Sequence, residues 1–502
     1  METVSLLIDG FGVALLPLNL TLILAGCFVG TLIGALPGLG PVNGVAILIP
    51  LTFAFGLDAT SSLILLSAVY YGCMYGGRIS SIMLNIPGDE PAIMTTLDGY
   101  PMARAGKAPE ALAISGVASF IGATLATVGL TLFAPLLAKA AIYFGPADYF
   151  ALYIMAFATI GGIGGVDPRK TLLAAMLGLM LGAVGLDPGT GVARYTFGLY
   201  QFYDGFDVIV ALVGLFAISE ILMFMESPLR EKLLPQIGRV LPRWSTLRGA
   251  FGASLRGSGI GFIAGLLPGA GASLGAVMSY TAEKRLNDKD GTFGKGDPRG
   301  VAAPEAGNNA ASGGALIPML TLGVPGSGTT AVMLAMLISL NVQPGPLLFE
   351  RQPGLVWGLI ASLYLANIAL LILNIPLIGV FTRLMRLPAW FLMPFVVAIS
   401  FIGIYAISRS PTDLLVMVAF GVLGFVLRKL DVSLVPVVLG LLLGVDMENN
   451  LRRALSISGG DWTVLVSSPI ALSLYAVTAA FLGLSIWLST RRAKPRAPAL
   501  GD

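Results

Sequence analysis

Histidine is absent from this chain of 502 residues, and only two cysteines occur. Without histidine there is no HExxH zinc site and no serine–histidine nucleophile pair. Cys27 and Cys73 lie in apolar sequence and form no CxxC motif, so a metal or disulfide role is not indicated. The GxxxxGK[ST] phosphate-binding loop of ATPases is also missing. The sequence therefore gives no support to an enzyme.

Charged residues are scarce as well, at 11% of the chain, whereas hydrophobic residues make up 56%. Soluble domains carry about 25% charged residues. Apolar runs recur from residue 14 to residue 489, and many approach the roughly 20 residues that a membrane-spanning helix needs. These features predict an all-α polytopic protein embedded in a lipid bilayer.

Basic residues gather in two short segments. Residues 227–249 contain five basic residues against Glu231 alone, and the tail after Trp487 contains Arg491, Arg492, Lys494 and Arg496. Because basic loops stay on the cytoplasmic side of a membrane, both segments, including the C-terminus, are expected in the cytoplasm. We interpret these runs as topology signals and expect no nucleic-acid partner. No basic residue precedes the first apolar run, so no cleaved signal peptide is expected.

Glycine and proline interrupt the apolar sequence at matching places. Residues 30–45 read GTLIGALPGLGPVNGV and residues 261–276 read GFIAGLLPGAGASLGA. A second pair follows, NIPGDEP at 85–91 and GVPGSGTT at 323–330. Helix-breaking residues at corresponding positions of two hydrophobic halves indicate a transporter binding site. The reason is that unpaired backbone groups at membrane depth must line a cavity or be buried in protein.

The matched breaks divide the chain. We predict a first transmembrane repeat at 15–226, a cytoplasmic connector at 227–249, a second repeat at 250–460 and a terminal transmembrane helix at 463–489. LGLMLG at residues 177–182 and LGLLLG at 439–444 extend the match. Loop charge does not decide between parallel and inverted repeats. Inverted repeats are expected because they recur in secondary transporters, and the short segments beside the breaks are expected to be half-helices or re-entrant hairpins.

The breaks supply candidate ligands for an anion. A helix that begins after a Pro-Gly break presents free N–H groups and a partial positive charge, which suit a carboxylate. The candidate substrate-binding residues at the breaks are Pro37, Gly38, Gly40, Asn43, Pro87, Gly88, Gly269, Gly271, Ser273, Pro325, Gly326, Ser327, Gly328 and Thr329. The alternative is structural: helix kinks with packing glycines, and a helix N-cap at the hydroxyl residues.

Polar residues at the head of an apolar run suggest a cation site. Asn308, Asn309 and Thr330 are the candidates, because carboxamide and hydroxyl oxygens suit Na⁺. The NH₂ groups of the two asparagines would suit a carboxylate instead. Glu305 is expected to cap the helix that begins there or, alternatively, to take a proton.

Arg78 also stands in apolar sequence, where an arginine is costly and suggests a function. Its guanidinium can hold a substrate carboxylate in bidentate fashion. The alternative is an interfacial residue that snorkels or pairs with Asp89 or Glu90. The sequence leaves both interpretations open.

Four segments resemble the large membrane subunit of tripartite tricarboxylate transporters, the TctA family: residues 75–107, 300–337, 34–41 and 265–273. The resemblance implies a secondary transporter of the bacterial inner membrane that imports an organic carboxylate without a cofactor. It implies coupling to a Na⁺ or H⁺ gradient, a small four-helix membrane subunit and a periplasmic solute-binding protein. Arg78 departs from the family pattern, in which a small residue is expected.

We therefore predict gradient-driven import, with the Pro-Gly hairpins forming a carboxylate site near mid-membrane in a moving, elevator-like unit. One alternative is a passive anion channel or pore, which would tolerate broken helices equally well. A membrane enzyme is a second alternative, against which the missing histidine argues. The sequence does not choose among citrate-like, dicarboxylate, aromatic and amino-acid substrates.

Overall fold

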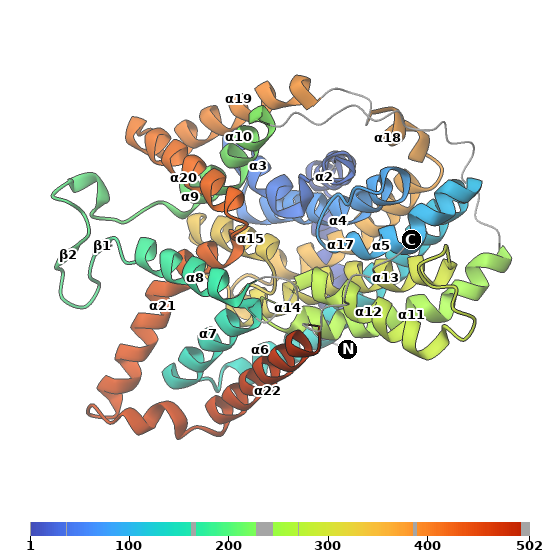
Figure 1. The fold of residues 1–502 in the computed structure, drawn as a ribbon. Coiled ribbons are helices and arrows are strands. Elements are labelled where there is room, and N and C mark those ends of the chain that lie inside the picture. Colours follow the sequence, from blue (N-terminus) through green and yellow to red (C-terminus); the bar gives the residue numbers. More distant parts are fainter. Residues whose placement is uncertain are drawn as a thin grey trace, which may run out of the picture.

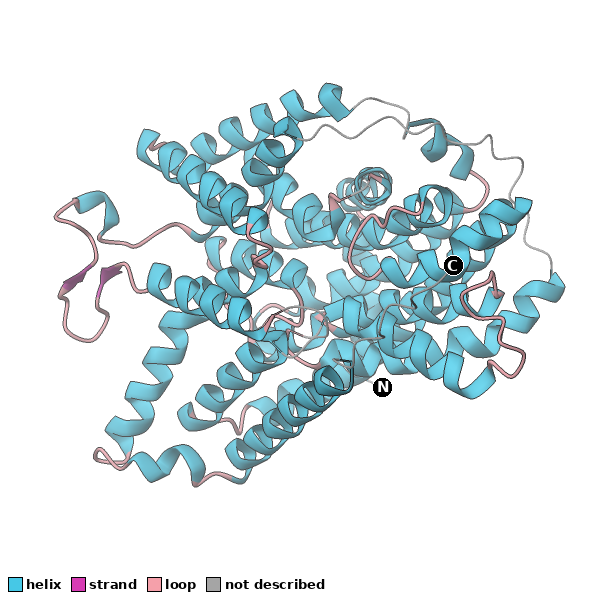
Figure 2. Ribbon diagram, viewed as in Figure 1, coloured by secondary structure: helices cyan, strands magenta, loops and turns pink. Residues whose placement is uncertain are grey.

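The computed structural model describes residues 2–36, 38–161, 167–226, 244–269, 271–384 and 389–492. Helices make up most of these residues, and a two-stranded antiparallel hairpin projects from the helical body (Figures 1 and 2). Five described helical segments are long and apolar enough to cross a membrane, at 17–35, 93–141, 208–226, 353–374 and 411–429. The all-α class and the apolar spans predicted for a polytopic membrane protein are thus present.

The elements before residue 227 are α1 (Glu2–Ala14), α2 (Pro17–Ala35), α3 (Gly40–Ala54), α4 (Ala59–Leu84), α5 (Ile93–Met102), the π-helix η1 (Ala103–Lys107), α6 (Ala108–Ala141), α7 (Pro146–Gly161), α8 (Pro168–Gly182), β1 (Gly185–Leu186), β2 (Ala193–Arg194), the 3₁₀-helix η2 (Tyr200–Phe202), α9 (Val208–Leu212), the π-helix η3 (Val213–Ile218) and α10 (Ser219–Glu226). In the hairpin, Gly185 pairs with Arg194. Helix α1 was not predicted from the sequence.

The elements after residue 243 are α11 (Trp244–Leu266), α12 (Gly271–Asn287), α13 (Pro298–Gly314), α14 (Leu316–Leu322), α15 (Gly328–Ser339), α16 (Leu348–Arg351), α17 (Pro353–Asn374), α18 (Ile378–Leu384), α19 (Ala389–Ser408), α20 (Pro411–Lys429), α21 (Val435–Ile457), the 3₁₀-helix η4 (Trp462–Val466) and α22 (Pro469–Arg492). Most of the predicted connector, 227–243, and the basic tail from residue 493 lie outside the described residues.

Two helix pairs pack more extensively than any others, α2 with α4 and α11 with α13. Glycines spaced four residues apart make both contacts: Gly26, Gly30 and Gly34 in α2, and Gly257, Gly261 and Gly265 in α11. A Cβ atom on Gly34 would lie 2.2 Å from the carbonyl oxygen of Cys73. One on Gly265 would lie 2.3 Å from that of Ala311. Small residues thus let the helix backbones touch, as they do in membrane helix packing.

Helix α13 begins two turns earlier than predicted. Pro298 occupies its first position, and the Asp297 carboxylate caps it by accepting from the Arg299 N–H at 2.8 Å. Proline and aspartate favour these positions, because proline needs no N–H partner and aspartate satisfies a free one. The expectation that Glu305 caps this helix is therefore wrong. Glu305 lies inside it.

The prediction of inverted repeats can be tested by comparing the directions of corresponding helices in the two halves. The Tyr71 side chain of α4 lies against Gly313 of α13, where a Cβ would be 2.7 Å from its hydroxyl. Arg78, further along α4, interacts electrostatically with Glu305, which comes earlier in α13. These two helices therefore run in opposite directions, as an inverted repeat requires of corresponding helices that cross the membrane.

A second pair runs in the same direction. Gly178 of α8 packs on Val437 of α21, and Gly182 packs on Leu441. These helices carry the LGLMLG and LGLLLG matches. A two-fold axis in the membrane plane reverses corresponding helices that cross the membrane, so this pair does not support inversion. The inverted arrangement stays a prediction.

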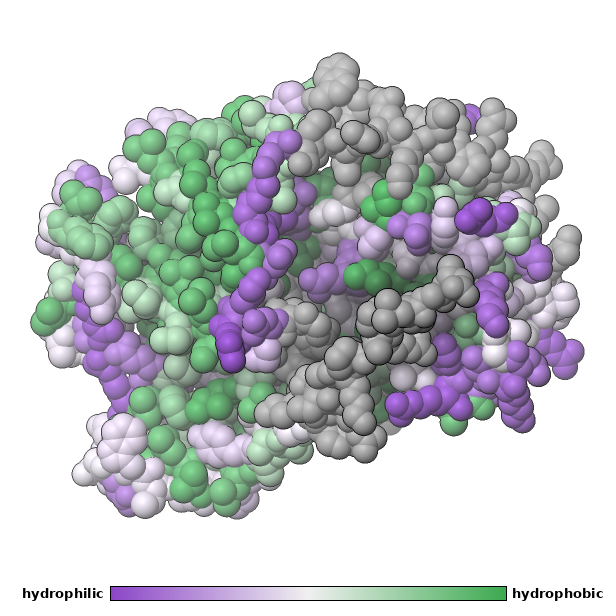
Figure 3. Space-filling view, in the orientation of Figure 1, coloured by the Kyte–Doolittle hydropathy of each residue, from purple (hydrophilic) through white to green (hydrophobic). Residues whose placement is uncertain are grey.

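The molecular surface has the character expected of a protein in lipid. Figure 3 shows apolar side chains gathered over the left part of the face, with a column of hydrophilic side chains near its centre and more hydrophilic side chains at the lower right. Among the exposed large apolar side chains are Leu132 and Leu136 on α6 and Leu172, Met176 and Met180 on α8. Water would disfavour such exposure, whereas acyl chains would not.

Candidate substrate site at the paired Pro-Gly breaks

Helices end and restart at the first pair of breaks, as predicted. Helix α2 ends at Ala35 and α3 begins at Gly40, while α11 ends at Leu266 and α12 begins at Gly271. The φ angles are 86° and 58° at Gly38 and Gly40, and 76° and 62° at Gly269 and Gly271. Only glycine adopts such angles without strain. Pro37, predicted as part of this site, lies outside the described residues.

The second pair of breaks also repeats its backbone. Asn85 ends α4 with φ 56° and ψ 34°, and Gly323 ends α14 with φ 68° and ψ 21°. Both residues are therefore left-handed helix caps. Asparagine tolerates this conformation better than other residues with a side chain. The same turn is thus built from different residues in the two halves.

Gly88 and Gly326 both approach the backbone of the protein. A Cβ on Gly88 would lie 2.3 Å from the carbonyl oxygen of Gly34, and one on Gly326 would lie 2.7 Å from the Cα of Ala315. Both glycines are thus required for close packing, whatever else they bind. This supports the structural alternative for both glycines.

Each of these turns contains a side chain that accepts a backbone hydrogen bond, and in the second half that side chain is a helix N-cap. The Ser327 hydroxyl accepts from the Thr330 N–H at 3.2 Å, and the Ser327 N–H donates to the Thr330 hydroxyl at 2.8 Å, which forms a capping box on α15. In the first half, Asp89 Oδ1 accepts from the Ala92 N–H at 3.0 Å. The N-cap interpretation of Ser327 is confirmed. Thr330 uses its hydroxyl within this cap, and its role as a cation ligand stays a prediction.

The breaks of the second half meet each other, and one of them reaches the first half. The Gly271 N–H donates to the Gly326 carbonyl oxygen at 3.1 Å. The Ser273 hydroxyl donates to Glu90 Oε2 at 3.2 Å. These two hydrogen bonds link three of the four predicted breaks, and the fourth, at residues 30–45, packs against the break at residues 85–91.

The remaining predicted residues line the same turns. Pro87 and Pro325 lie in the turns that precede α5 and α15. Gly328 and Thr329 are the first two residues of α15, and Thr329 is buried. A Cβ on Gly328 would touch a valine side chain from α3 and another from α21, so this helix end is enclosed by both halves.

Asn43 belongs to an ionic cluster that the sequence did not reveal. Its Nδ2 donates to Glu220 Oε2 at 3.1 Å, and its Oδ1 accepts from Arg428 Nη2 at 3.1 Å. Glu220 and Arg428 also form an ion pair with each other. Both ends of the Asn43 side chain are therefore engaged. Charged residues in the apolar runs of α10 and α20 were the signal that could have indicated this cluster.

Arg78 does not lie at an interface as the snorkelling interpretation required, and its role as a substrate ligand stays a prediction. It is fully buried, Nη1 donates to the Leu112 carbonyl and the Ser115 hydroxyl at 2.7 and 2.6 Å, and Nη2 donates to the carbonyl and side chain of Asn374 at 3.2 Å. Among the described residues it forms no ion pair with the acids of the neighbouring turn. The guanidinium thus joins α4 to α6 and α17 through Nη1 and Nη2, while its buried Nε has no hydrogen-bond partner.

The two adjacent asparagines of α13 carry unused acceptors. Asn308 and Asn309 are each 1% exposed, and neither Oδ1 atom has a hydrogen-bond partner. Asn309 Nδ2 donates to the Glu305 carbonyl at 3.0 Å. Buried polar atoms are normally satisfied, so these oxygens are positions where a water molecule or cation would be stabilised.

A separate groove of about 1010 Å³ opens between α1, α2, α4 and α17. Asn19, Phe55, Ser61 and Leu355 are among its lining residues. None of the predicted site residues lines it. The groove is therefore distinct from the Pro-Gly breaks.

A model of the tripartite tricarboxylate transporter TctA family matches residues 20–439. Among curated proteins, an uncharacterized 52.8 kDa protein in the TAR-I ttuC' 3' region of Agrobacterium vitis is 39% identical over 494 residues, which cover 98% of each chain. An uncharacterized protein in the TAR-II ttuC' 3' region of the same organism is 42% identical over 214 residues, 43% of this chain and 88% of that protein. No solved structure matches the chain.

Proposed function

Since the chain belongs to the tripartite tricarboxylate transporter TctA family, we propose that it is the large membrane subunit of an importer of organic carboxylates. In this proposal it is a secondary transporter of the bacterial inner membrane, driven by an ion gradient. A small four-helix membrane subunit and a periplasmic solute-binding protein are its partners. Its basic C-terminus faces the cytoplasm.

The observation that carries the proposal is the convergence of two helix N-termini. Helix α12 begins at Gly271 and α15 begins after Ser327, and a Cβ on Gly271 would lie 3.7 Å from the Ser327 Cβ. Both helix starts carry a partial positive charge, and they are linked directly, because the Gly271 N–H donates to the Gly326 carbonyl oxygen. A carboxylate is the ligand class that such a place stabilises.

We assign the substrate carboxylate to this convergence. Gly269, Gly271 and Ser273 contribute from the start of α12. Gly326 and Ser327 contribute from the start of α15. A bare anion loses too much hydration energy to enter the protein without such donors. The glycines admit the ligand to the backbone, and the hydroxyl groups add hydrogen bonds.

Transport requires the site to face both sides of the membrane in turn. We propose that the breaks belong to a moving unit related to its counterpart by inverted repeats at 15–226 and 250–460. The opposite directions of α4 and α13 support this arrangement, whereas α8 and α21 do not. Asn308 and Asn309 remain candidates for a coupling Na⁺ ion, and the alternative coupling ion is a proton.

The test is uptake by proteoliposomes that contain the assembled transporter, with the binding protein loaded with radiolabelled citrate or malate. Saturable accumulation that depends on a Na⁺ or H⁺ gradient is expected. Equilibration without accumulation would support a passive anion pore instead. Conversion of the substrate to a product would support an enzyme.

A further inference from the structure

Glu305 occupies the middle of the central helix α13. Every residue of this helix from Gly300 to Gly314 is buried, and Glu305 is 1% exposed. Its Oε1 accepts from the hydroxyl of Thr95 in α5, and its Oε2 accepts from the hydroxyl of Ser119 in α6 at 3.1 Å. Among the described residues it has no ion-pair partner. A full negative charge in such a place, without a bonded cation, is costly.

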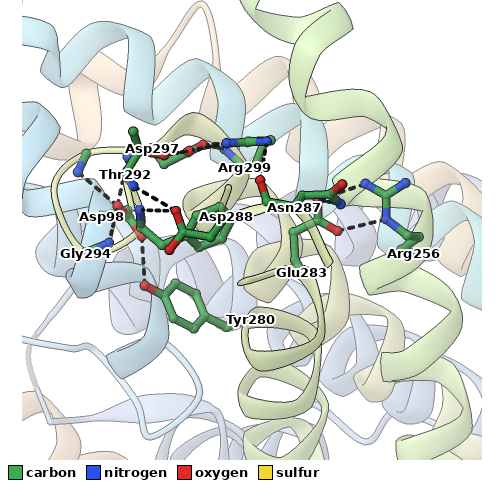
Figure 4. Close-up of polar contacts among 12 residues, drawn as sticks. Asp98, Arg256, Tyr280, Glu283, Asn287, Asp288, Thr292, Gly294, Asp297 and Arg299 are labelled. Atoms are coloured by element: carbon green, nitrogen blue, oxygen red, sulfur yellow. Dashed lines mark hydrogen bonds and ion pairs between the residues drawn. The ribbon is translucent and has the colours of Figure 1, made fainter. Parts of the chain in front are cut away.

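Two other buried carboxylates show a different environment. Glu283, also 1% exposed, accepts from Arg256 Nε and Nη2 at 2.8 Å each and from Asn287 Nδ2 at 2.7 Å (Figure 4). Asp98 accepts from three backbone N–H groups of residues 294–297 and from the Tyr280 hydroxyl. Amide N–H and guanidinium groups can only donate, so these partners offer no acceptor for a carboxyl proton.

The partners of Glu305 are hydroxyl groups, which differ from these N–H donors. A hydroxyl group can donate a hydrogen bond or accept one. Thr95 and Ser119 can both donate to an ionised Glu305, and either can accept from its proton after a rotation of the hydroxyl. The site therefore holds the carboxylate and the carboxylic acid without losing a contact.

The groups that interact electrostatically with Glu305 lie on α4 and in the turn after it. They are Arg78, Tyr75 and Asp89. Arg78 is the cation among them, and its hydrogen bonds go to α6 and α17 instead of to Glu305. Helices α5 and α6 contribute the hydroxyls. The charge on Glu305 is thus balanced through space and not by a direct bond.

Glu305 also joins the two Pro-Gly turns. Thr95 lies on α5, which follows the first turn, and α13 leads through α14 into the second. Asn308 and Asn309 follow Glu305 by three and four positions, which places them about one helical turn further on. Their unpartnered oxygens extend a polar row from Glu305 toward the second turn.

We propose that Glu305 is the carboxyl group that binds and releases the coupling proton. The ionised carboxylate takes up one proton to become the acid, and the acid loses that proton on the other side of the membrane. The proposal rests on the proposed function and assigns its coupling ion.

The experiment compares Glu305→Gln with Glu283→Gln, the same substitution at an equally buried glutamate. Infrared difference spectra recorded between acidic and neutral pH should contain the carbonyl band of a protonated carboxylic acid in the wild type and in Glu283→Gln. Glu305→Gln should lack that component. In proteoliposomes, Glu305→Gln should lose accumulation of citrate or malate driven by a pH gradient by at least ten-fold while it keeps citrate or malate exchange.

Several results would overturn the proposal. They are an unchanged band in Glu305→Gln, undiminished pH-driven accumulation by this variant, and wild-type accumulation that follows a Na⁺ gradient alone. In the last case, Asn308→Ala and Asn309→Ala should impair uptake instead. If Glu305→Gln does not elute as a monodisperse protein, Glu305→Asp replaces it as the test variant. This variant keeps a carboxyl group, so it should keep the infrared band but shift the pH profile of uptake. An unshifted profile would count against the proposal.

A wild-type transporter that exchanges neither citrate nor malate would refute the proposed function. The infrared comparison would still test Glu305, since it does not depend on transport.

Discussion

Two turns share features of backbone conformation but differ in the chemistry of their side chains: residues 85–91 and residues 323–330. Each begins with a left-handed cap, contains a Pro-Gly pair and ends in a side chain that accepts from the N–H three residues later. In the first turn that side chain is the carboxylate of Asp89, and in the second it is the hydroxyl of Ser327. Glu90 adds a second acid to the first turn.

This difference in side chains suits the two turns to ligands of opposite charge: the acidic first turn to a cation and the second turn to an anion. A Cβ on Gly40, the first residue of α3, would lie 3.4 Å from the Asp89 Cβ. The protein's own carboxylate is thus placed beside the start of α3, where it offsets the positive end of that helix. At the start of α15 the corresponding side chain is the neutral hydroxyl of Ser327, whereas at the start of α12 Ser273 already donates to the Glu90 carboxylate. A substrate carboxylate is therefore favoured at the second turn.

The glycine contacts are where the two halves are most alike, and breaking them should give the largest effect. Gly34→Leu and Gly265→Leu should each destabilise the folded protein by about 1–3 kcal/mol or more, because both force helix backbones apart. The two effects should be similar in size. The measurement is the thermal midpoint of the detergent-solubilised protein by fluorescence-detected gel filtration.

Gly259→Leu is the control, since a Cβ there meets no atom within 4 Å and the residue also lies on α11. It should leave the midpoint unchanged. A midpoint that falls equally in all three variants would show that the effect does not come from helix packing.

Arg78 is the sharpest difference in packing between the halves. Because the contact of Gly88 with Gly77 matches that of Gly326 with Ala315, the counterpart of Arg78 is Leu316. Arg78→Ala removes hydrogen bonds from a charged donor and should cost about 1.5–3 kcal/mol of stability. Arg78→Lys should lose nearly as much, because a single ammonium cannot reach the Leu112 and Asn374 carbonyls together. Thermal midpoints measure this.

Uptake kinetics separate this structural role from substrate binding. A variant with a normal midpoint and a raised KM for citrate would restore Arg78 as a carboxylate ligand.

Ser327→Ala and Asp89→Ser test the assignment of charge to the two turns. Ser327→Ala should raise the KM for citrate about three- to ten-fold, since one hydrogen bond of about 0.5–1.5 kcal/mol is lost. Asp89→Ser gives the first turn the same side chain as Ser327 in the second turn. It also keeps an oxygen that can accept from the Ala92 N–H. It should leave the KM within about two-fold.

Uptake by proteoliposomes gives both values. The opposite ranking of the two variants would move the carboxylate to the first turn.

The smallest expected effect concerns the β1–β2 hairpin, which among the described residues occurs in the first half only. The pKa of Asp187 lies well below its usual value, because Arg452 donates to it, with further help from the Gly189 N–H and Arg194. A depressed folded-state pKa contributes stability above the unfolded pKa of about 3.9, and that stability is lost as the pH falls through the folded value. Asp187→Asn should therefore lower the thermal midpoint slightly at pH 7 and flatten its decline toward pH 3.

Thermal midpoints from pH 7 to pH 3 measure this, with Asp461→Asn as the control, because that aspartate has no cationic partner among the described ion pairs. An unchanged decline in Asp187→Asn would show that the hairpin is held by other contacts.

The sequence by itself determined the features that depend on backbone conformation and hydropathy. Glycine and proline specify where α2, α11 and α14 end, because few residues adopt the dihedral angles at Gly38, Gly269 and Gly323. The N-cap at Ser327 is equally local. Apolar runs indicate the membrane spans because their length must match the bilayer.

Only the tertiary structure decided which polar side chains meet. Arg78 bonds with Asn374, and Glu305 bonds with Thr95, across 296 and 210 positions of the chain. Arg428 reaches Asn43 across 385 positions. In an apolar environment a polar side chain must find a partner, but the partner's identity depends on how distant helices pack. No local pattern carries that information, so the sequence flagged Arg78 and Asn43 as important and left their partners open.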